Sequence, residues 1–502
     1  MKTTIINSLL IGGSLLSASL LTSTSAAGSS PKEDKNLKKP NILWIVADDL
    51  GTDLGCYGNQ SVITENLDRL AGEGILFSNC HTVTAVCSPS RSGLITGMYP
   101  VSINCHQHRT RKEAMKKLPK GIKTITEYFE EAGYYTFNGS CEKPGKPGKE
   151  DYNFITDYEI YDGVDWRERK EGQPFFGQIQ IHKPHRPFRR DTARPVDPSG
   201  LKVPPYWPDH TLIRQDMAFY LETVQLVDRE VGKILERLKK DGLEENTYVF
   251  FVGDQGSPMV RHKQFLYDGG TNTPLIVRFP KKEHAKEVRE ELISNIDLAA
   301  TALQLAGINI PAYMQGQNFL GAHKPRTEVF SMRDRRDESV DRIRAVRTGR
   351  FKYIRNYYPE MPYTQYNAYK RNQYPCLPLM EVLKEAKRLS SVQLQFLSDS
   401  RPEEELYDLS ADPYEIYNLA EDASYRGIKQ ELKEKLEQWL EECDRATYPE
   451  DQREIDYWKK QMAKMDSIWK VKKRLPLAPT NQEYVSWWEK KFESLFKSQE
   501  SK

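Results

Sequence analysis

The feature of the sequence that most constrains its fold is the alternation of short apolar segments with longer stretches of helical periodicity. Continuous apolar segments of this kind are typical of parallel strands that are buried on both faces. Strands that alternate with helices predict an α/β fold, in which helices cover both faces of a mostly parallel sheet. The predicted strands cover residues 41–47, 75–77, 134–137, 174–181, 247–252 and 274–278.

The predicted helices lie between these strands. The longest one covers residues 215–240, where apolar side chains recur at helical spacing and form one stripe. The helices predicted over residues 124–132 and 297–306 are each followed by a glycine, which is a common helix stop. The remaining predicted helices cover residues 65–72, 90–96, 124–132 and 297–306.

The chain is long enough for one large domain and a smaller one, since it has 502 residues of which 38% are hydrophobic. Aromatic and charged residues dominate after about residue 342. We therefore expect an N-terminal domain over residues 40–342 and a smaller C-terminal α+β subdomain with a helical tail over residues 343–502. The net charge of +2 gives no indication of a nucleic-acid partner.

The N-terminus has the pattern of a secretory signal peptide. Lys2 precedes an apolar run over residues 5–21, and small residues then offer a cleavage site. The alternative is a membrane anchor, but glycine and serine interrupt the run, which is shorter than the roughly 20 apolar residues that a span needs. We expect a signal peptide over residues 1–27, a polar linker over 28–39, export to the periplasm or medium, and no stable membrane insertion.

Acidic and histidine side chains follow three of the predicted strands. Asp48 and Asp49 follow the first strand, His182 follows the strand over residues 174–181, and Asp254 follows the strand over 247–252. Open α/β sheets bind ligands at this edge. Three acids that converge there would repel one another without a cation, and hard cations prefer oxygen ligands. The sequence therefore predicts a divalent metal site.

One of the seven cysteines begins an unusual segment, CSPSRSGLITG, over residues 87–97. An odd number of cysteines leaves at least one unpaired or used for another purpose. The pattern Cys-x-Pro-Ser-Arg followed by Thr-Gly resembles the signature of the type I sulfatases, which belong to the alkaline phosphatase superfamily. The alternative is an unmodified core cysteine beside a turn.

The resemblance implies an alkaline-phosphatase-like sandwich and a specific nucleophile. In that family a maturation enzyme converts the cysteine to formylglycine, here at Cys87, and an oxygen of its hydrate attacks the sulfur of a sulfate ester. Arg91 is then expected to stabilise the attacking oxygen in its anionic form.

The resemblance extends over residues 40–420 and implies a metal site. The segments PNILWIVADDLG and NTYVFFVGDQG are similar to the two metal segments of the family. Gln255 stands where the family more often has Asn or His. The implied cation is Ca²⁺, with Mg²⁺ as the alternative. The implied ligands are Asp48, Asp49, Asp254, Gln255 and the group made from Cys87.

The resemblance also implies contacts with the sulfate group. His182, in the segment HKPH, corresponds to a general acid or leaving-group contact, which suits histidine near neutral pH. Lys263 begins the family's Lys-x-x-x-Tyr-x-Gly segment. Lys149, in the segment GKED, corresponds to a lysine that binds the sulfate group in the family. Lys143 and Lys146 are the alternatives for this position. Asp151 stands where the family often has histidine.

Further basic side chains are expected on the substrate side of the site. The residues expected to bind substrate are His106, His108, Arg109 and His185, and the rim expected to surround them contains Arg186, Arg189 and Arg190. Such a rim suits a polyanionic sugar chain, although a solvated charged loop is the alternative. The similarity to N-sulfoglucosamine and iduronate sulfatases favours removal of sulfate from a glycan.

Four alternatives to a glycan O-sulfatase remain. Two are other sulfatase reactions, namely hydrolysis of an N-sulfate or of a small non-sugar sulfate ester. The third is a phosphonate hydrolase or phosphodiesterase, which normally uses Thr or Ser in place of Cys87. The fourth is an inactive binding protein, in which we would expect a missing ligand or nucleophile.

Overall fold

The computed structural model describes residues 39–500. The predicted signal peptide and all of the linker except residue 39 lie outside the described residues. Within residues 39–500, none of the helices combines the length and the apolar character that a membrane span requires.

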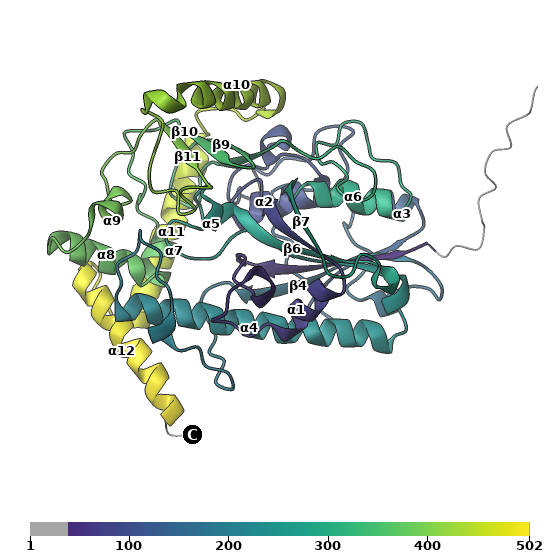
Figure 1. Cartoon of the computed structure of the whole chain (residues 1–502), viewed down its shortest axis with the longest axis horizontal. Coiled ribbons are helices and arrows are strands. Elements are labelled where there is room, and N and C mark those ends of the chain that lie inside the picture. The colour runs from purple at the N-terminus through teal and green to yellow at the C-terminus, as the bar shows by residue number, and fades with distance from the viewer. Residues whose placement is uncertain (1–38, 501–502) are drawn as a thin grey trace, which may run out of the picture. The chain divides into compact units, whose positions relative to one another are not determined.

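A seven-stranded sheet forms the centre of the fold (Figure 1). Strands β3, β4, β1 and β5 are parallel neighbours, and β7 is parallel to β2, whereas β6 is antiparallel to both of its neighbours. The predicted mostly parallel sheet is therefore confirmed. In order across the sheet, the strands are β3 (Tyr135–Ser140), β4 (Phe175–Pro184), β1 (Asn41–Asp48), β5 (Thr247–Gly253), β6 (Asn272–Arg278), β2 (Ile75–His81) and β7 (Glu287–Ser294).

The edge strand β7 was not predicted. Its sequence, EVREELIS, is mostly charged in the first half, and its first five residues alternate between exposed and half-buried. An edge strand has one neighbour and needs no continuous apolar sequence, so hydrophobicity gave no signal for it.

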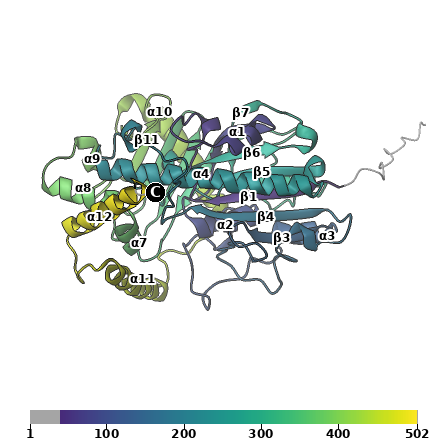
Figure 2. The same cartoon turned by 90° about the horizontal axis from the view of Figure 1, so that it is seen from below.

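Helices cover both faces of the sheet, and strand β1 shows why its sequence is apolar throughout. Its side chains alternate between two separate cores: Leu43 and Ile45 belong to one, and Ile42 and Trp44 to the other. Helix α4 runs along one face of the sheet together with α1 (Figures 1 and 2). The helices of the first face are α1 (Glu65–Gly72) and α4 (Thr211–Lys240), and those of the second are α2 (Cys87–Thr96), α3 (Ile125–Glu131) and α6 (Asp297–Leu305).

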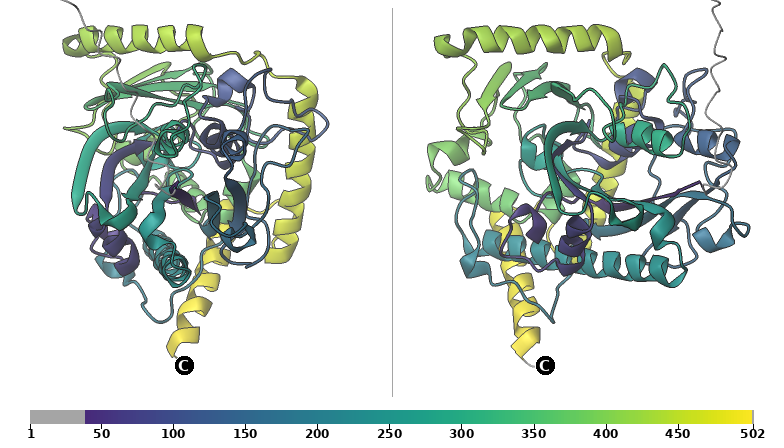
Figure 3. Two further views of the ribbon diagram at one scale, coloured as in Figure 1. Left: turned by 90° about the vertical axis from the view of Figure 1, so that its right-hand side faces the viewer. Right: turned by 45° about the vertical axis from the view of Figure 1, so that its right-hand side comes forward.

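A second, antiparallel sheet of four strands follows in the chain. Helix α10 packs on it through Leu436 and Trp439 (Figure 3). The strands are β8 (Glu328–Arg333), β9 (Ile343–Thr348), β10 (Phe351–Asn356) and β11 (Glu404–Asp408). The later helices are α5 (Asp268–Thr271), α7 (Ala368–Gln373), α8 (Cys376–Glu385), α9 (Ser391–Gln395), α10 (Arg426–Cys443), α11 (Gln452–Lys473) and α12 (Asn481–Glu500). A division of the chain at residue 342 remains a prediction.

The carboxyl ends of three parallel strands meet at one edge of the central sheet. Ala47 at the end of β1 pairs with Gly253 at the end of β5, and Asp48 pairs with Pro184 of β4 after a register shift. Helix α2 begins at Cys87, three residues before the predicted start at residue 90. The fold therefore brings the acidic strand ends and the Cys87 segment to the same place.

Candidate active site

Three carboxylates form the base of the site. Asp48, Asp49 and Asp254 are at most 1% exposed. The backbone N–H of Asp49 donates to Oδ1 of Asp254 at 2.9 Å. Asp49 has a φ of 66°, in the left-handed region that costs a non-glycine residue about 1 kcal/mol. Such a strained backbone is typical of functional sites.

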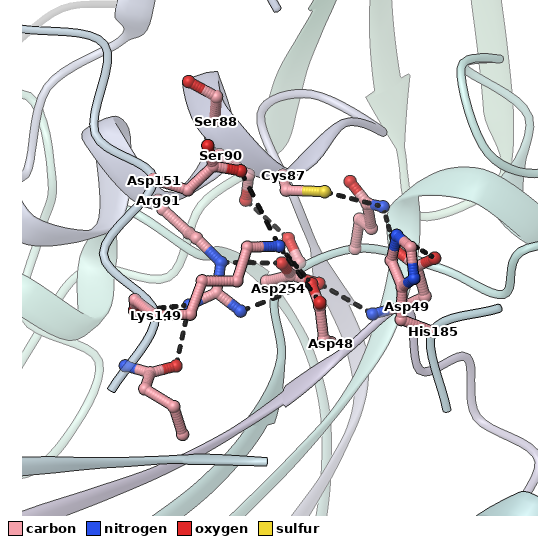
Figure 4. Close-up of polar contacts among 12 residues, drawn as sticks. Asp48, Asp49, Cys87, Ser88, Ser90, Arg91, Lys149, Asp151, His185 and Asp254 are labelled. Carbon is pink, nitrogen blue, oxygen red and sulfur yellow. Dashed lines mark hydrogen bonds and ion pairs between the residues drawn. The ribbon is translucent and has the colours of Figure 1, made fainter. Parts of the chain in front are cut away.

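Cys87 faces these carboxylates from the first turn of α2 (Figure 4). Its Sγ and one carboxylate oxygen from each of Asp48 and Asp254 all lie within 4.8 Å of one another. The Lys263 Nζ is 3.7 Å from the same sulfur. Burial raises the pKa of the Cys87 thiol, so an unmodified thiolate is disfavoured here despite the lysine.

Arg91, one helical turn after Cys87, connects the helix to the acidic cluster. Its Nε lies 2.9 Å from Oδ2 of Asp254, and its Nη2 lies 3.4 Å from Oδ1 of Asp48. Its Nη1 donates to Oε1 of Gln180 at 2.7 Å. Gln180 was not predicted as a site residue, although a buried glutamine in the apolar strand over residues 174–181 was an available signal.

Two lysines take separate partners among the adjacent acids. The Lys149 Nζ lies 2.8 and 3.0 Å from the two oxygens of Asp48, and the Lys263 Nζ lies 2.6 and 2.7 Å from those of Asp49. Burial alone would lower both lysine pKa values, but the paired carboxylates raise them, so both lysines stay charged. Of the three lysines considered for the segment around residue 149, Lys149 makes this contact.

His182 and His185 lie beside the same two acids, and their pKa values are shifted in opposite directions. The His182 Nδ1 is 3.0 Å from Oδ2 of Asp48, and this hydrogen bond raises the His182 pKa. The His185 Nε2 is 3.9 Å from Oδ2 of Asp49, and burial lowers the His185 pKa to about 4. The rings stack with centroids 5.0 Å apart, so a histidine with a raised pKa and a histidine with a lowered pKa lie side by side.

The side chains at this point fit a hard divalent cation. The buried Oε1 of Gln255 has no hydrogen-bond partner within the described chain, while its Nε2 donates to Asp49. The positions of an amide O and N are assigned from the surrounding hydrogen bonds. A bound cation would favour the orientation in which the Gln255 oxygen faces the carboxylates. Burial raises the pKa of Asp254 to about 7, with Asp48 adding to this effect and Arg91 opposing it. A cation at this cluster would relieve that repulsion.

The fold places the residues of the segment 106–109 in different surroundings. The His108 Nδ1 lies 3.1 Å from Oδ1 of Asp337, and His108 has a ring nitrogen within 4.8 Å of the Cys87 Sγ and an Asp151 oxygen. Arg109 pairs with Asp151 at 3.0 Å. Asp337 was not predicted, because nothing in its local sequence indicates that it meets His108.

The first residue of this segment, His106, is 8% exposed, and its ring lies 6.2 Å from that of Tyr448. Its environment is therefore the interior next to the second sheet rather than the acidic cluster. A role for His106 in substrate binding remains a prediction.

A cleft of about 580 Å³ opens over the acidic cluster. Its lining is rich in basic side chains, which suits an anionic ligand. The charged and histidine residues that line it are Asp48, Arg91, Glu142, Lys143, Lys149, His182, Lys183, His185, Arg186 and Arg189.

Two members of the expected basic rim serve the interior of the fold instead. Arg186 is 5% exposed, and its Nη1 donates to Oδ1 of Asp216 at 2.8 Å. The Arg190 Nη2 donates to Oε1 of Glu222 at 2.9 Å. Both acids lie on α4, so these two arginines fasten the loop after β4 to that helix and are not free for substrate. Arg189 is exposed and forms no ion pair with any residue from 39 to 500.

This contrast predicts different outcomes for two neighbouring substitutions. Arg186→Met is expected to lower the free energy of unfolding by about 3–5 kcal/mol, because it leaves the Asp216 carboxylate buried without its partner. Arg189→Met is expected to leave stability unchanged within about 0.5 kcal/mol. Urea unfolding measures both, and equal stability of the two variants would contradict the structural role of Arg186.

Comparison with known proteins decides the family. The family model described as Sulfatase matches residues 40–308, and that described as N-sulphoglucosamine sulphohydrolase, C-terminal, matches residues 259–397. The chain belongs to the sulfatase family. An ulvan-active sulfatase of Formosa agariphila is 34% identical over 85% of this chain and 79% of its own length. Human N-sulphoglucosamine sulphohydrolase is 27% identical over 80% of this chain and 89% of its own length.

Solved structures agree on the fold of this sulfatase. BT4656, solved with its substrate D-glucosamine-2-N,6-O-disulfate, has a TM-score of 0.60 and 20% identity, and the match covers 82% of this chain and all of that one. A phosphonate monoester hydrolase of Agrobacterium radiobacter also has a TM-score of 0.60, with 18% identity over 80% of this chain and 96% of that one. The predicted alkaline-phosphatase-like fold is confirmed. Because both activities occur on this fold, the family match, and not the fold, establishes a sulfuric ester hydrolase.

Proposed function

We propose that this sulfatase removes sulfate from a sulfated carbohydrate, with a formylglycine at position 87 and a divalent cation. The observation that carries the proposal is the position of Cys87, whose buried Sγ lies within 4.8 Å of a carboxylate oxygen of Asp48 and of Asp254 and 3.7 Å from the Lys263 Nζ, beside a basic cleft. The names of the relatives support a glycan, since they include an ulvan-active sulfatase and N-sulphoglucosamine sulphohydrolase. The maturation enzyme that acts on Cys87 is part of the proposal.

The proposed metal ligands are the carboxylates of Asp48, Asp49 and Asp254, the amide oxygen of Gln255, and the group at position 87. All of these are oxygen ligands once Cys87 is converted, which favours Ca²⁺, with Mg²⁺ as the alternative. Formylglycine supplies a hydrated aldehyde whose hydroxyl acts as nucleophile, and the cation supplies positive charge beside it.

The side chains around position 87 have separate proposed roles. Lys149 and Lys263 bind the oxygens of the sulfate group, since both stay charged in this buried site. Arg91 fixes the helix end against Asp254 and Asp48. His182 lines the cleft, and the hydrogen bond of its Nδ1 to Asp48 favours the protonated ring. Its other ring nitrogen, Nε2, gives a proton to the leaving oxygen of the sugar.

Substitution of His182 tests its role as the general acid. His182→Ala is expected to lower kcat for a sugar sulfate by about 10²–10⁴-fold. For an aryl sulfate the loss is expected to be much smaller, because a phenolate leaves without protonation. Kinetics on both substrates measure the difference, and His284→Ala, which removes an exposed histidine on the turn before β7, is the control. An equal loss on both substrates would exclude proton donation by His182.

Sulfate release from a panel of sulfated oligosaccharides tests the function. The panel contains O-sulfated and N-sulfated sugars, because the match of residues 259–397 to the N-sulphoglucosamine sulphohydrolase family favours N-sulfate hydrolysis as a second candidate. The protein is co-expressed with a formylglycine maturation enzyme. Release from no sugar, when mass spectrometry detects formylglycine at position 87, would overturn the glycan proposal and point to a small non-sugar sulfate ester.

Export is a further part of the proposal. The sequence of residues 1–27 supports a cleaved signal peptide, and a periplasmic or secreted enzyme would meet external sulfated polysaccharide. The N-terminal sequence of the mature protein tests this, because a mature chain that still begins at Met1 would contradict it.

A further inference from the structure

Helix α11 ends at a patch that carries the two most exposed large hydrophobic side chains of residues 39–500. Val471, in the last turn of the helix, is 69% exposed, and Leu477, in the turn before α12, is 80% exposed. The Lys470 Nζ donates to the backbone oxygen of Leu477 at 3.1 Å, which holds this turn against the end of the helix. Single exposed hydrophobic residues are ordinary, but two neighbouring ones indicate a contact surface.

The patch continues along the outer side of α11, a helix at the periphery of the molecule (Figure 2). Lys460, Lys464, Ile468 and Val471 are spaced three or four residues apart, so they lie along one side of the helix. All four side chains are exposed. Apolar and basic side chains therefore share this surface.

The opposite side of α11 faces the rest of the protein. Ile455 and Met462 are buried, at 8% and 7% exposure. Asp466 is also buried, and its Oδ1 accepts from the Asn372 Nδ2 of α7 at 2.7 Å. Because these contacts hold the helix from one side, its outer side is open to a partner.

The charge of the patch is positive. Two lysines near the end of α11 do not contribute to it, because Lys470 is paired with Asp466 at 2.6 Å and burial lowers the pKa of Lys473 to about 7. Four other cations of the patch are exposed and form no ion pair within the described chain, and these are Lys460, Lys464, Lys472 and Arg474.

Few acids adjoin these cations in the chain. Between Asp466 and Glu483 the sequence has no acid. Glu483 accepts from the Thr480 N–H at 2.7 Å, and Asp456, earlier in α11, accepts from Gln452 at 2.8 Å. Counting both of these acids leaves four cations against two carboxylates, so the patch keeps a net positive charge.

We propose that this α11 patch binds the surface of a lipid bilayer with anionic headgroups. The patch comprises Lys460, Lys464, Ile468, Val471, Lys472, Arg474 and Leu477. Anionic bilayers bind segments that combine exposed apolar side chains with lysine or arginine. Val471 and Leu477 would enter the boundary between headgroups and acyl chains, and the cations would contact the lipid phosphates while their aliphatic stems pack beside them. The contact is peripheral, and it would keep the proposed exported enzyme beside a membrane.

Two other partners fit the α11 patch less well. A second copy of the chain in a twofold contact would place the same cations on both sides of the interface, where they would repel one another. A sulfated polysaccharide would compensate the cations but is hydrophilic, so it would leave Val471 and Leu477 in water. An anionic bilayer accommodates both kinds of side chain.

The first test is flotation of the full mature protein with lipid vesicles, at one calcium concentration in all samples. The protein is expected to bind vesicles of equal parts phosphatidylglycerol and phosphatidylcholine but not vesicles of phosphatidylcholine alone, and binding is expected to weaken as salt is raised. Cys87→Ala is expected to bind equally, so the result does not depend on sulfatase activity. Equal binding to both kinds of vesicle, or binding to neither, would overturn the proposal.

Removal of two cations tests the charge of the patch. Lys472→Gln with Arg474→Gln is expected to lower the partition coefficient for anionic vesicles about 30-fold, because each cation near such a surface contributes about fivefold. Lys116→Gln with Lys120→Gln makes the same charge change at two other exposed lysines and is expected to leave binding unchanged. Equal losses in the two double variants would contradict the assigned patch.

Removal of the two apolar side chains tests their entry into the bilayer. Val471→Ser with Leu477→Ser is expected to lower the partition coefficient at least about tenfold and to leave the melting temperature unchanged, because both side chains are exposed. Val288→Ser is the control, since Val288 is 62% exposed but follows Glu287 on the edge strand β7. Full vesicle binding by the double variant would refute the proposed contact.

Sedimentation and binding of dextran sulfate test the other two partners. Neither double variant is expected to change the oligomeric state. A dimer that Val471→Ser with Leu477→Ser dissociates would assign the patch to a second copy of the chain. Dextran sulfate binding that needs Lys472 and Arg474, without any vesicle binding, would assign the patch to a polysaccharide. Either of these results would overturn the bilayer proposal.

Discussion

Replacing Cys87 by alanine is expected to lower sulfate release by about 10⁴-fold or more, because the substitution removes the thiol that maturation would convert to the aldehyde. The carboxylates, Lys149 and Lys263 remain in the variant, so substrate binding is expected to persist. The measurement is kcat/KM for the best sugar sulfate, together with calorimetry of substrate binding. Mass spectrometry of the wild-type peptide is expected to show that oxygen has replaced sulfur at position 87.

Cys376→Ala is the matched control for this experiment. Cys376 is a buried cysteine on α8 with 6% exposure, and it lies outside the lining of the cleft. Its replacement is expected to lower stability by roughly 1 kcal/mol through lost packing and to leave kcat/KM unchanged. Full activity of Cys87→Ala, or of wild-type protein whose Cys87 is unconverted, would refute the proposed nucleophile.

Removal of the divalent cation is expected to abolish activity and to make stability depend on pH in a specific direction. Without the cation, burial holds the pKa of Asp254 at about 7, above its unfolded value of 3.8. The folded state then binds the proton more tightly than the unfolded chain does. The Asp254 contribution to stability is therefore full below about pH 4 and is lost as the pH rises to about 7. A bound cation favours the carboxylate and removes this loss.

The difference in melting temperature between the calcium-loaded and chelated protein is therefore expected to widen from about pH 4 to about pH 7. Asp254→Asn keeps an acceptor for the Asp49 N–H but removes the charge, so it is expected to abolish both the calcium effect and this part of the pH dependence. Asp399→Asn, which changes an exposed carboxylate, is the control. A constant difference across this pH range, or a calcium effect that survives in Asp254→Asn, would exclude Asp254 as a ligand.

The local sequence around the strand ends predicted much of the site. A strand such as β1 must be apolar at every position because both of its faces are covered, and the first polar residues after it must therefore lie at the sheet edge. This reasoning located Asp48, Asp49 and Asp254. The resemblance of the Cys87 segment to the sulfatase signature then indicated the chemistry, and the family match agrees with it.

The partners of the charged side chains could not be predicted in the same way. Arg186, Arg189 and Arg190 are alike in sequence, yet the first and third pair with acids of α4 while the second faces solvent. Periodicity specifies which face of an element is apolar, but not which distant element meets it. The same limit applies to His108, whose partner Asp337 lies far along the chain.

The sequence by itself determined the α/β class, the acidic strand ends and the cysteine segment, because each depends on residues close together in the chain. The tertiary structure decided which cations are free for substrate and that Gln180 contacts Arg91. These features arise where segments separated by tens to hundreds of residues come into contact. The free energy of a buried charge depends on all of its neighbours, and these are known only once the chain is folded.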